Sequence, residues 1–121
     1  MVFLNKDIKM IKAGVLGAGH LGKIHLRLLD TSNHYELVGF YDPNTQNAKA
    51  LSKEKGYSLF ESAEALIEAC DMIDIVTPTL NHHEVALKAL KAGKHIFIEK
   101  PIANSLAEAL EITQTAAQHG L

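Results

Sequence analysis

An α/β fold with a doubly wound parallel sheet is predicted by two features of this 121-residue sequence. Short apolar runs alternate with longer amphipathic segments five times along the chain, and only a few residues connect one segment to the next. Alternation at this spacing is typical of βαβ units, in which the strands pair in parallel. Because βαβ crossovers are right-handed, helices should cover both faces of the sheet. We therefore expect about five strands of such a sheet, with the sixth strand missing.

The predicted strands are short and apolar, and several end at a residue that interrupts β-structure. Gly17 ends the first run, Asp42 ends the second, and Pro78 ends the fourth. Proline cannot donate a hydrogen bond to a sheet, so termination of the strand is the simplest interpretation of Pro78. The five predicted strands are residues 12–17, 35–42, 57–60, 72–78 and 95–99.

The predicted helices carry start and stop signals. Asn44 and Ser62 are residue types that favour the N-cap position, where a side-chain oxygen accepts a hydrogen bond from the first turn. Gly56, Gly93 and Gly120 follow amphipathic segments and are typical of helix C-termini. The predicted helices are residues 20–29, 44–56, 62–70, 81–93 and 104–120.

Composition limits the class of protein. Hydrophobic residues make up 47% of the chain, charged residues 21%, and the formal net charge is −2, which is ordinary for a globular domain. No basic cluster points to a nucleic-acid partner, and no long apolar run predicts a membrane span. A single cysteine, Cys70, excludes an intrachain disulfide and fits a reducing compartment. Residues 1–10 lack the features of a secretory signal, so we expect a short lead-in and a cytoplasmic protein.

A glycine-rich turn, GAGHLG at residues 17–22, follows the first predicted strand and opens a helix. In this context Gly17 permits a tight turn, Gly19 leaves room for a pyrophosphate, and Gly22 allows close packing of the helix. Backbone N–H groups at the helix N-terminus would point at the phosphates. A glycine turn without a ligand is the alternative. The dinucleotide-binding residues predicted here are Gly17, Ala18, Gly19, His20, Leu21 and Gly22.

The second predicted strand ends in Asp42. A dinucleotide-binding unit of this type carries an acid about 20 residues after the glycine turn, where it accepts hydrogen bonds from the adenosine ribose. A carboxylate there would repel a 2′-phosphate, so NAD is favoured over NADP. Asp42 also suits the start of the turn at Pro43 and Asn44, and both roles are compatible.

Further candidates lie at the end of the fourth predicted strand and just beyond it. Ligands of open α/β sheets bind at the carboxyl ends of the strands, which places Thr77 and Pro78 at the cofactor site. His82 and His83 are adjacent on a helix and cannot share a face, so we predict no metal site. One of them could face the nicotinamide, and the other is expected to be solvated. His25 is expected to pack against the sheet.

The stretch HIFIEKPIA, residues 95–103, ends the fifth predicted strand with an acid, a base and a proline. Termination of the strand explains Pro101. It does not explain Glu99 and Lys100, which would stand at the same edge of the sheet as the glycine turn.

Together, GxGxxGxxH, an Asp ending the second strand, TPxxxH and AGKHIFIEKPIA resemble the N-terminal domain of the Gfo/Idh/MocA oxidoreductases (glucose–fructose oxidoreductase, inositol dehydrogenase and relatives). The resemblance runs from about Ile11 to Gly120. It implies a dinucleotide-binding Rossmann domain over residues 11–121, followed in the family by an α+β domain that supplies the substrate pocket and usually the oligomer contacts. We therefore expect this chain to be a piece of a longer protein and to be inactive by itself. The full-length protein is expected to be a homo-oligomer.

The resemblance also implies roles for single residues. Lys100 would be catalytic, near the nicotinamide and the reacting carbinol of a sugar, cyclitol or polyol. Glu99 would help to position the nicotinamide ribose, and Pro101, often preceded by a cis bond in the family, would direct Lys100 into the cleft. His82 matches the histidine of the family's TPxxxH element. Thr79 departs from the family, because many members have asparagine there.

Two alternatives remain open from the sequence. A free-standing NAD-sensing regulatory module would share the length, the glycine turn and the acid after the second strand. It would need no catalytic lysine, so Glu99, Lys100 and Pro101 favour the oxidoreductase. A family member that has lost catalysis is the other alternative.

Overall fold

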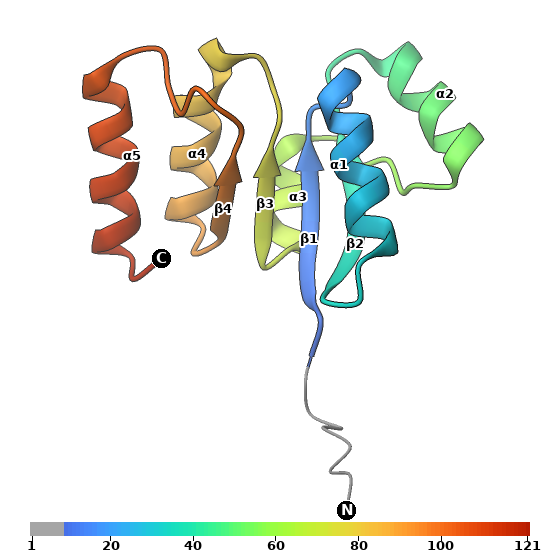
Figure 1. Ribbon diagram of the computed structural model, residues 1–121, viewed down its shortest axis with the longest axis horizontal. Coiled ribbons are helices and arrows are strands. Elements are labelled where there is room, and N and C mark those ends of the chain that lie inside the picture. The colour runs from blue at the N-terminus through green and yellow to red at the C-terminus, as the bar shows by residue number, and fades with distance from the viewer. Residues whose placement is uncertain (1–8) are drawn as a thin grey trace, which may run out of the picture.

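The computed structural model describes residues 9–121, shown in Figure 1. The predicted lead-in, residues 1–10, therefore lies mostly outside the described residues. Four strands form one parallel sheet in the order β2-β1-β3-β4. Their bounds are Ile11–Leu16 for β1, Tyr35–Tyr41 for β2, Met72–Ile75 for β3 and His95–Ile98 for β4. The predicted α/β fold with a doubly wound parallel sheet is confirmed.

The segment 57–60, predicted as a strand, is not one. It makes one isolated parallel bridge, between Phe40 and Leu59, on the outer side of β2. The Phe40 N–H donates to the Ser58 carbonyl at 2.9 Å, and the Phe60 N–H donates to the Phe40 carbonyl at 2.9 Å. The pairing stops there because Ser62 already caps the next helix, which leaves too little chain for a longer ladder.

The helices begin and end close to where the sequence predicts. The side chains of Asn44 and Ser62 accept hydrogen bonds from the backbone N–H groups of Asn47 and Ala65, and Gly56 ends its helix with a left-handed φ of 78°. The α-helices are α1 (His20–Thr31), α2 (Thr45–Lys55), α3 (Ala63–Ala69), α4 (His82–Lys91) and α5 (Leu106–Gln118), and a short 3-10 helix, η1 (Thr79–Asn81), precedes α4. Within residues 9–121, no helix combines the length and apolar character that crossing a membrane requires.

Apolar side chains fill both faces of the sheet. On one face, Leu26 of α1 and Ala48 of α2 pack with Val15 and Phe40. On the other face, Leu66 of α3, Leu90 of α4 and Ile112 of α5 pack with Ile73 and Ile75, among other residues. Burial of this kind stabilises the folded state by roughly 25 cal/mol for each Å² of apolar surface removed from water. The sheet is therefore covered on both sides, as right-handed crossovers require.

The topology determines where a ligand can bind. Chain order moves from β1 outward to β2 on one side and returns to β3 on the other, so the strand order switches beside β1. In Figure 1 the arrowheads of β1, β3 and β4 point to the same edge of the sheet, where the loops before α1 and α4 lie, and β2 runs parallel to β1. A switch point at the carboxyl ends of parallel strands is the usual ligand site of open α/β sheets.

Candidate dinucleotide-binding site

The glycine turn between β1 and α1 is held tightly by its neighbours. Gly17 has a φ of +106°, and a Cβ built on it would lie 2.5 Å from the Val76 carbonyl oxygen. A Cβ on Gly22 would collide with the carbonyl oxygen of Gly17. A Cβ on Gly19, by contrast, would have no atom within 4 Å. Two of the glycines are therefore required by the fold, whereas Gly19 faces open space.

Asp42 ties the end of β2 to this turn. Its Oδ2 accepts a hydrogen bond from the Ala18 N–H at 2.7 Å, and its Oδ1 accepts one from the Asn44 N–H at 2.8 Å. The second bond is the turn-starting role considered from the sequence. The first is a long-range contact, because Ala18 and Asp42 are 24 residues apart. Both oxygens retain further lone pairs, so the carboxylate can still accept hydrogen bonds from a ligand.

A cavity of about 660 Å³ opens beside the turn and Asp42. It lies between the first turn of α1, the end of β2 and the beginnings of α3 and α4. Eight of the predicted cofactor-binding residues line it: Gly17, Gly19, His20, Leu21, Gly22, Asp42, Thr77 and Pro78. Ala63, Asn81, Glu84 and Val85 also line it and were missed from the sequence, although their place at helix starts along this edge of the sheet could have indicated them.

His82 does not line this cavity. Its side chain is buried, with Nδ1 3.0 Å from the Pro101 carbonyl oxygen and Nε2 2.9 Å from the Thr77 carbonyl oxygen. The ring thus joins the loop after β3 to the turn after β4, where the Lys100–Pro101 bond is cis. Contact of His82 with a cofactor stays a prediction, and in this structure its ring supports the backbone on either side. His83 instead contacts Glu111 of α5, with Nε2 2.8 Å from Oε2.

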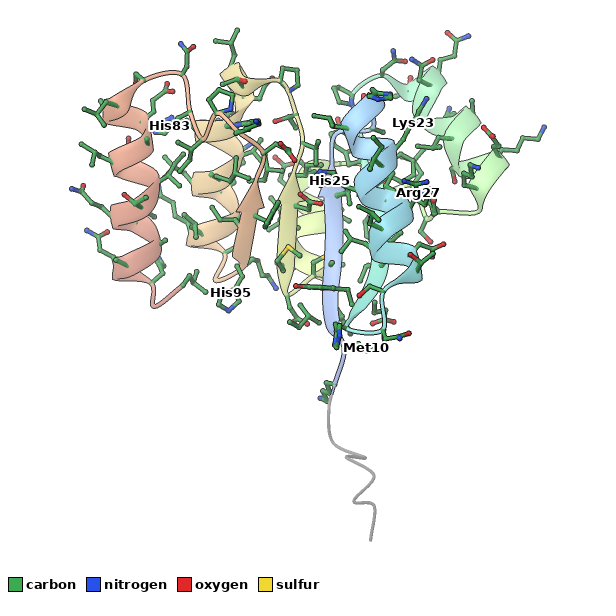
Figure 2. The ribbon with its side chains drawn as sticks, viewed as in Figure 1. Met10, Lys23, His25, Arg27, His83 and His95 are labelled. Carbon is green, nitrogen blue, oxygen red and sulfur yellow. The ribbon has the colours of Figure 1, made fainter. Side chains whose placement is uncertain are left out.

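A partly buried group of ionisable side chains beside β4 was not predicted. His25 Nδ1 lies 2.7 Å from Asp74 Oδ2, and His25 Nε2 lies 3.0 Å from Glu99 Oε1. In Figure 2, His25 lies on the side of α1 toward β1 and β3, whereas Lys23 and Arg27 lie on the side toward α2. Burial raises the pKa of Asp74, and the hydrogen bond with His25 opposes that rise. The signal in the sequence was an aspartate inside an apolar strand.

Glu99 and Lys100 stand at the end of β4, where the Glu99 N–H donates to the Ile75 carbonyl at 3.1 Å. Lys100 is exposed. Neither residue lines the cavity described above, so their contact with a cofactor stays a prediction. Within residues 9–121, no cluster of three or more His, Cys, Asp or Glu side chains is arranged to hold a metal ion.

The residues present fit a dinucleotide. Space for a pyrophosphate exists at Gly19, which lines the cavity and where an added Cβ would meet no atom within 4 Å. The N-terminus of α1 presents backbone N–H groups to this space. A carboxylate lies at the end of β2, where a ribose is bound in such folds. The fold and site define a dinucleotide-binding domain of the Rossmann type.

Comparison with known proteins assigns the family. A family model described as "Oxidoreductase family, NAD-binding Rossmann fold", GFO_IDH_MocA, matches residues 11–121. The chain belongs to this family, as the resemblance in the sequence predicted.

Individual relatives support the assignment. Glucose-6-phosphate 3-dehydrogenase of Bacillus subtilis is 42% identical over 107 residues, which cover 88% of this chain and 31% of that protein. The scyllo-inositol 2-dehydrogenase (NAD(+)) of the same organism is 34% identical, over 92% of this chain and 34% of that protein. The solved structure of UDP-N-acetylglucosamine 3-dehydrogenase from Acidithiobacillus ferrooxidans superposes with a TM-score of 0.87 at 34% identity, over 93% of this chain and 37% of that one. The chain thus spans about a third of the length of the relatives it matches.

Proposed function

We propose that this domain binds NAD, in preference to NADP, as the cofactor-binding part of an oxidoreductase acting on a hydroxyl-bearing carbon of a sugar, cyclitol or polyol. The observation that carries the proposal is the cavity at the switch point, with Gly19 open to it and Asp42 at its edge. The names of the relatives support the substrate class, since they act on sugars or inositol.

The preference for NAD rests on Asp42. A carboxylate at the end of β2 accepts hydrogen bonds from ribose hydroxyls and repels a 2′-phosphate. Comparison alone leaves the choice open, because a similar structure, at 27% identity, is a biliverdin reductase in complex with NADP+. In this chain the Asp42 carboxylate accepts hydrogen bonds from two backbone N–H groups, and this support would hold it in place for the proposed contact with a ribose.

Lys100 is the proposed catalytic residue. When bound, the nicotinamide ring accepts or returns a hydride. The Lys100 ammonium would donate a hydrogen bond to the substrate hydroxyl, and its positive charge would stabilise the oxygen as the hydroxyl proton passes to a basic side chain of the second domain. Glu99 would orient the nicotinamide ribose. The substrate pocket and the contacts of a homo-oligomer would come from the second domain that the family carries, and the proposed location is the cytoplasm.

Titration of the 121-residue chain tests the proposal. Calorimetry with NADH, NADPH and ADP-ribose should give the tightest binding for NADH, and NADH should raise the melting temperature because it binds only the folded state. Lys100→Ala should weaken binding of NADH, whose nicotinamide end would lie near Lys100 under this proposal, and leave binding of ADP-ribose unchanged. Lys53→Ala, an exposed lysine of α2 away from the cavity, is the matched control. Absence of binding at millimolar NADH and NADPH would refute the proposal.

A further inference from the structure

Three ionisable side chains from three elements form a continuous row that leads from the core to the end of β4. Asp74 of β3 is buried, with a side-chain exposure of 6%, His25 of α1 has 15%, and Glu99 has 26%. His25 stands in the middle, 2.7 Å from Asp74 Oδ2 and 3.0 Å from Glu99 Oε1. The row therefore ends next to Lys100, the proposed catalytic residue.

The fold brings these residues to one face of the sheet. Asp74 is level with Val15 on one side and with Phe97 on the other. Since side chains alternate along a strand, Glu99 points to the same face as Phe97, toward α1. Phe97 also contacts the His25 ring edge-on, with centroids 6.3 Å apart. Only the pairing of β1, β3 and β4 in this register produces the row.

An ionised carboxylate is costly at the position of Asp74. Its Oδ1 has no hydrogen-bond partner among residues 9–121, and a buried polar atom without a partner costs free energy. Val15 and Leu26 close the core around this face of the sheet. Asp74 therefore needs a proton nearby, and His25 Nδ1 is the group within hydrogen-bond distance of Oδ2.

The positions of the protons follow from the two contacts. If Glu99 is ionised, its contact with His25 is attractive only when Nε2 carries a hydrogen. The Nδ1 contact with Asp74 then also needs a proton, held either by Asp74 Oδ2 or by Nδ1. In both cases a proton is retained between Asp74 and His25, and Nε2–H points at Glu99.

We propose that Asp74 and His25 are positioning residues that retain a proton between Asp74 Oδ2 and His25 Nδ1, so that His25 Nε2–H holds the Glu99 carboxylate at the nicotinamide end of the site. This inference rests on the proposed function and deepens it. It assigns a role in cofactor orientation to two residues that line no part of the large cavity. The pair acts through Glu99 and does not touch the substrate.

A purely structural role makes different predictions. If Asp74 and His25 only filled space, an apolar residue of similar size at position 74 would serve equally well. If the retained proton matters, Asp74→Asn should preserve the arrangement, because the asparagine N–H can donate to Nδ1 and leave the hydrogen on Nε2. Asp74→Leu should abolish it, because leucine has no donor. Asp71→Asn, directly before β3, where the Asp71 side chain contacts the Lys12 backbone instead of the row, is the matched control.

Two measurements on the 121-residue chain test the proposal. The first is long-range ¹H–¹⁵N NMR of the His25 ring without ligand, which reports which nitrogen is protonated. The second is the ratio of the dissociation constants of ADP-ribose and NADH, which isolates binding at the nicotinamide end. We expect a hydrogen on Nε2 in the unmutated protein and in Asp74→Asn. The ratio of the two dissociation constants should agree within about two-fold between these two proteins. Asp74→Leu should lower the affinity for NADH roughly five- to twenty-fold and leave the affinity for ADP-ribose unchanged.

The variant Glu99→Ala completes the test. It should lose the same part of NADH affinity as Asp74→Leu, and the double variant should bind no worse than either single one, because the residues act through one contact. An unprotonated Nε2 in the unmutated protein overturns the inference even if Asp74→Leu is unstable. The inference is also overturned if Asp74→Leu changes the affinity for neither ligand, or changes the affinities for both ligands equally. If the unmutated protein binds neither ligand, the proposed function itself has failed.

Discussion

The glycine turn offers a paired test of which glycines serve the fold and which serves the ligand. Gly19 and Gly22 are three residues apart in the same motif, yet the structure separates them completely. An added Cβ meets no atom at Gly19, and it collides with the carbonyl of Gly17 at Gly22. Replacing each by alanine adds the same methyl group in two different surroundings.

We expect Gly19→Ala to change stability little. Gly19 has φ −74° and ψ −160°, which alanine adopts without strain. The lower entropy of the unfolded alanine chain stabilises the fold by about 0.4–1 kcal/mol. Gly19 is also the N-cap of α1, and alanine is a poorer N-cap than glycine by a comparable amount. The two effects offset each other, so the free energy of unfolding should stay within about 0.5 kcal/mol.

Binding of the dinucleotide, in contrast, should be clearly weakened by Gly19→Ala. The alanine methyl at position 19 would occupy the space beside which the pyrophosphate is proposed to lie. An overpacked contact costs about 1–3 kcal/mol, which corresponds to a loss of NADH affinity of roughly five- to 150-fold. In Gly22→Ala the collision is with backbone, so the free energy of unfolding should fall by about 1–3 kcal/mol, or by roughly 4 °C per kcal/mol in melting temperature.

The assay is urea denaturation of both variants without ligand, together with calorimetric titration of NADH. The result that refutes the reasoning is a Gly19→Ala variant that binds NADH within two-fold of the unmutated protein. Equal destabilisation by the two substitutions would refute it as well, because it would mean that Gly19 is required by the fold.

Three further outcomes are expected. Asp42→Ala should weaken the binding free energy of NAD by about 1.5–3 kcal/mol, the range for a hydrogen bond to a charged group, and reduce the difference in affinity between NAD and NADP in parallel titrations. Equal affinities for NAD and NADP in the unmutated protein would contradict this. Burial raises the pKa of Asp74 above its ordinary value of 3.8, so the folded protein holds that proton more tightly than the unfolded chain and stability falls as pH rises through this range. Asp74→Asn should remove that fall, which denaturation between about pH 3 and pH 7 would measure; an unchanged pH profile would count against it. Burial raises the pKa of the Cys70 thiol to about 11, so an aromatic disulfide reagent at pH 8 should modify native Cys70 only as fast as the protein opens, and reaction within seconds without denaturant would exclude this.

Local signals in the sequence determined most of the fold. Asn44, Ser62 and Gly56 mark helix ends because caps depend on the residue type and its own backbone angles. The alternation of strands and helices determined the parallel sheet and its two covered faces, since right-handed crossovers leave no other arrangement. The glycine turn and Asp42 could be placed together because both follow strands that end at one edge.

Tertiary structure decided how far these signals extend. Residues 57–60 have the composition of a strand, yet they form one bridge, because the cap at Ser62 comes too soon. His82 has a place in a family motif, yet its ring is buried between the carbonyls of Thr77 and Pro101. Neither outcome is visible locally, because each depends on where a distant segment lies.

The row of Asp74, His25 and Glu99 shows the same limit most clearly. The sequence determined that an aspartate interrupts an apolar strand, that a histidine follows the glycine turn and that an acid ends β4. Their contacts span 49 and 74 residues, and they exist only because β3 pairs with both β1 and β4 in one register. Side-chain periodicity determines the face on which a residue lies, whereas the partner it meets there is determined by the packing of the whole sheet against α1.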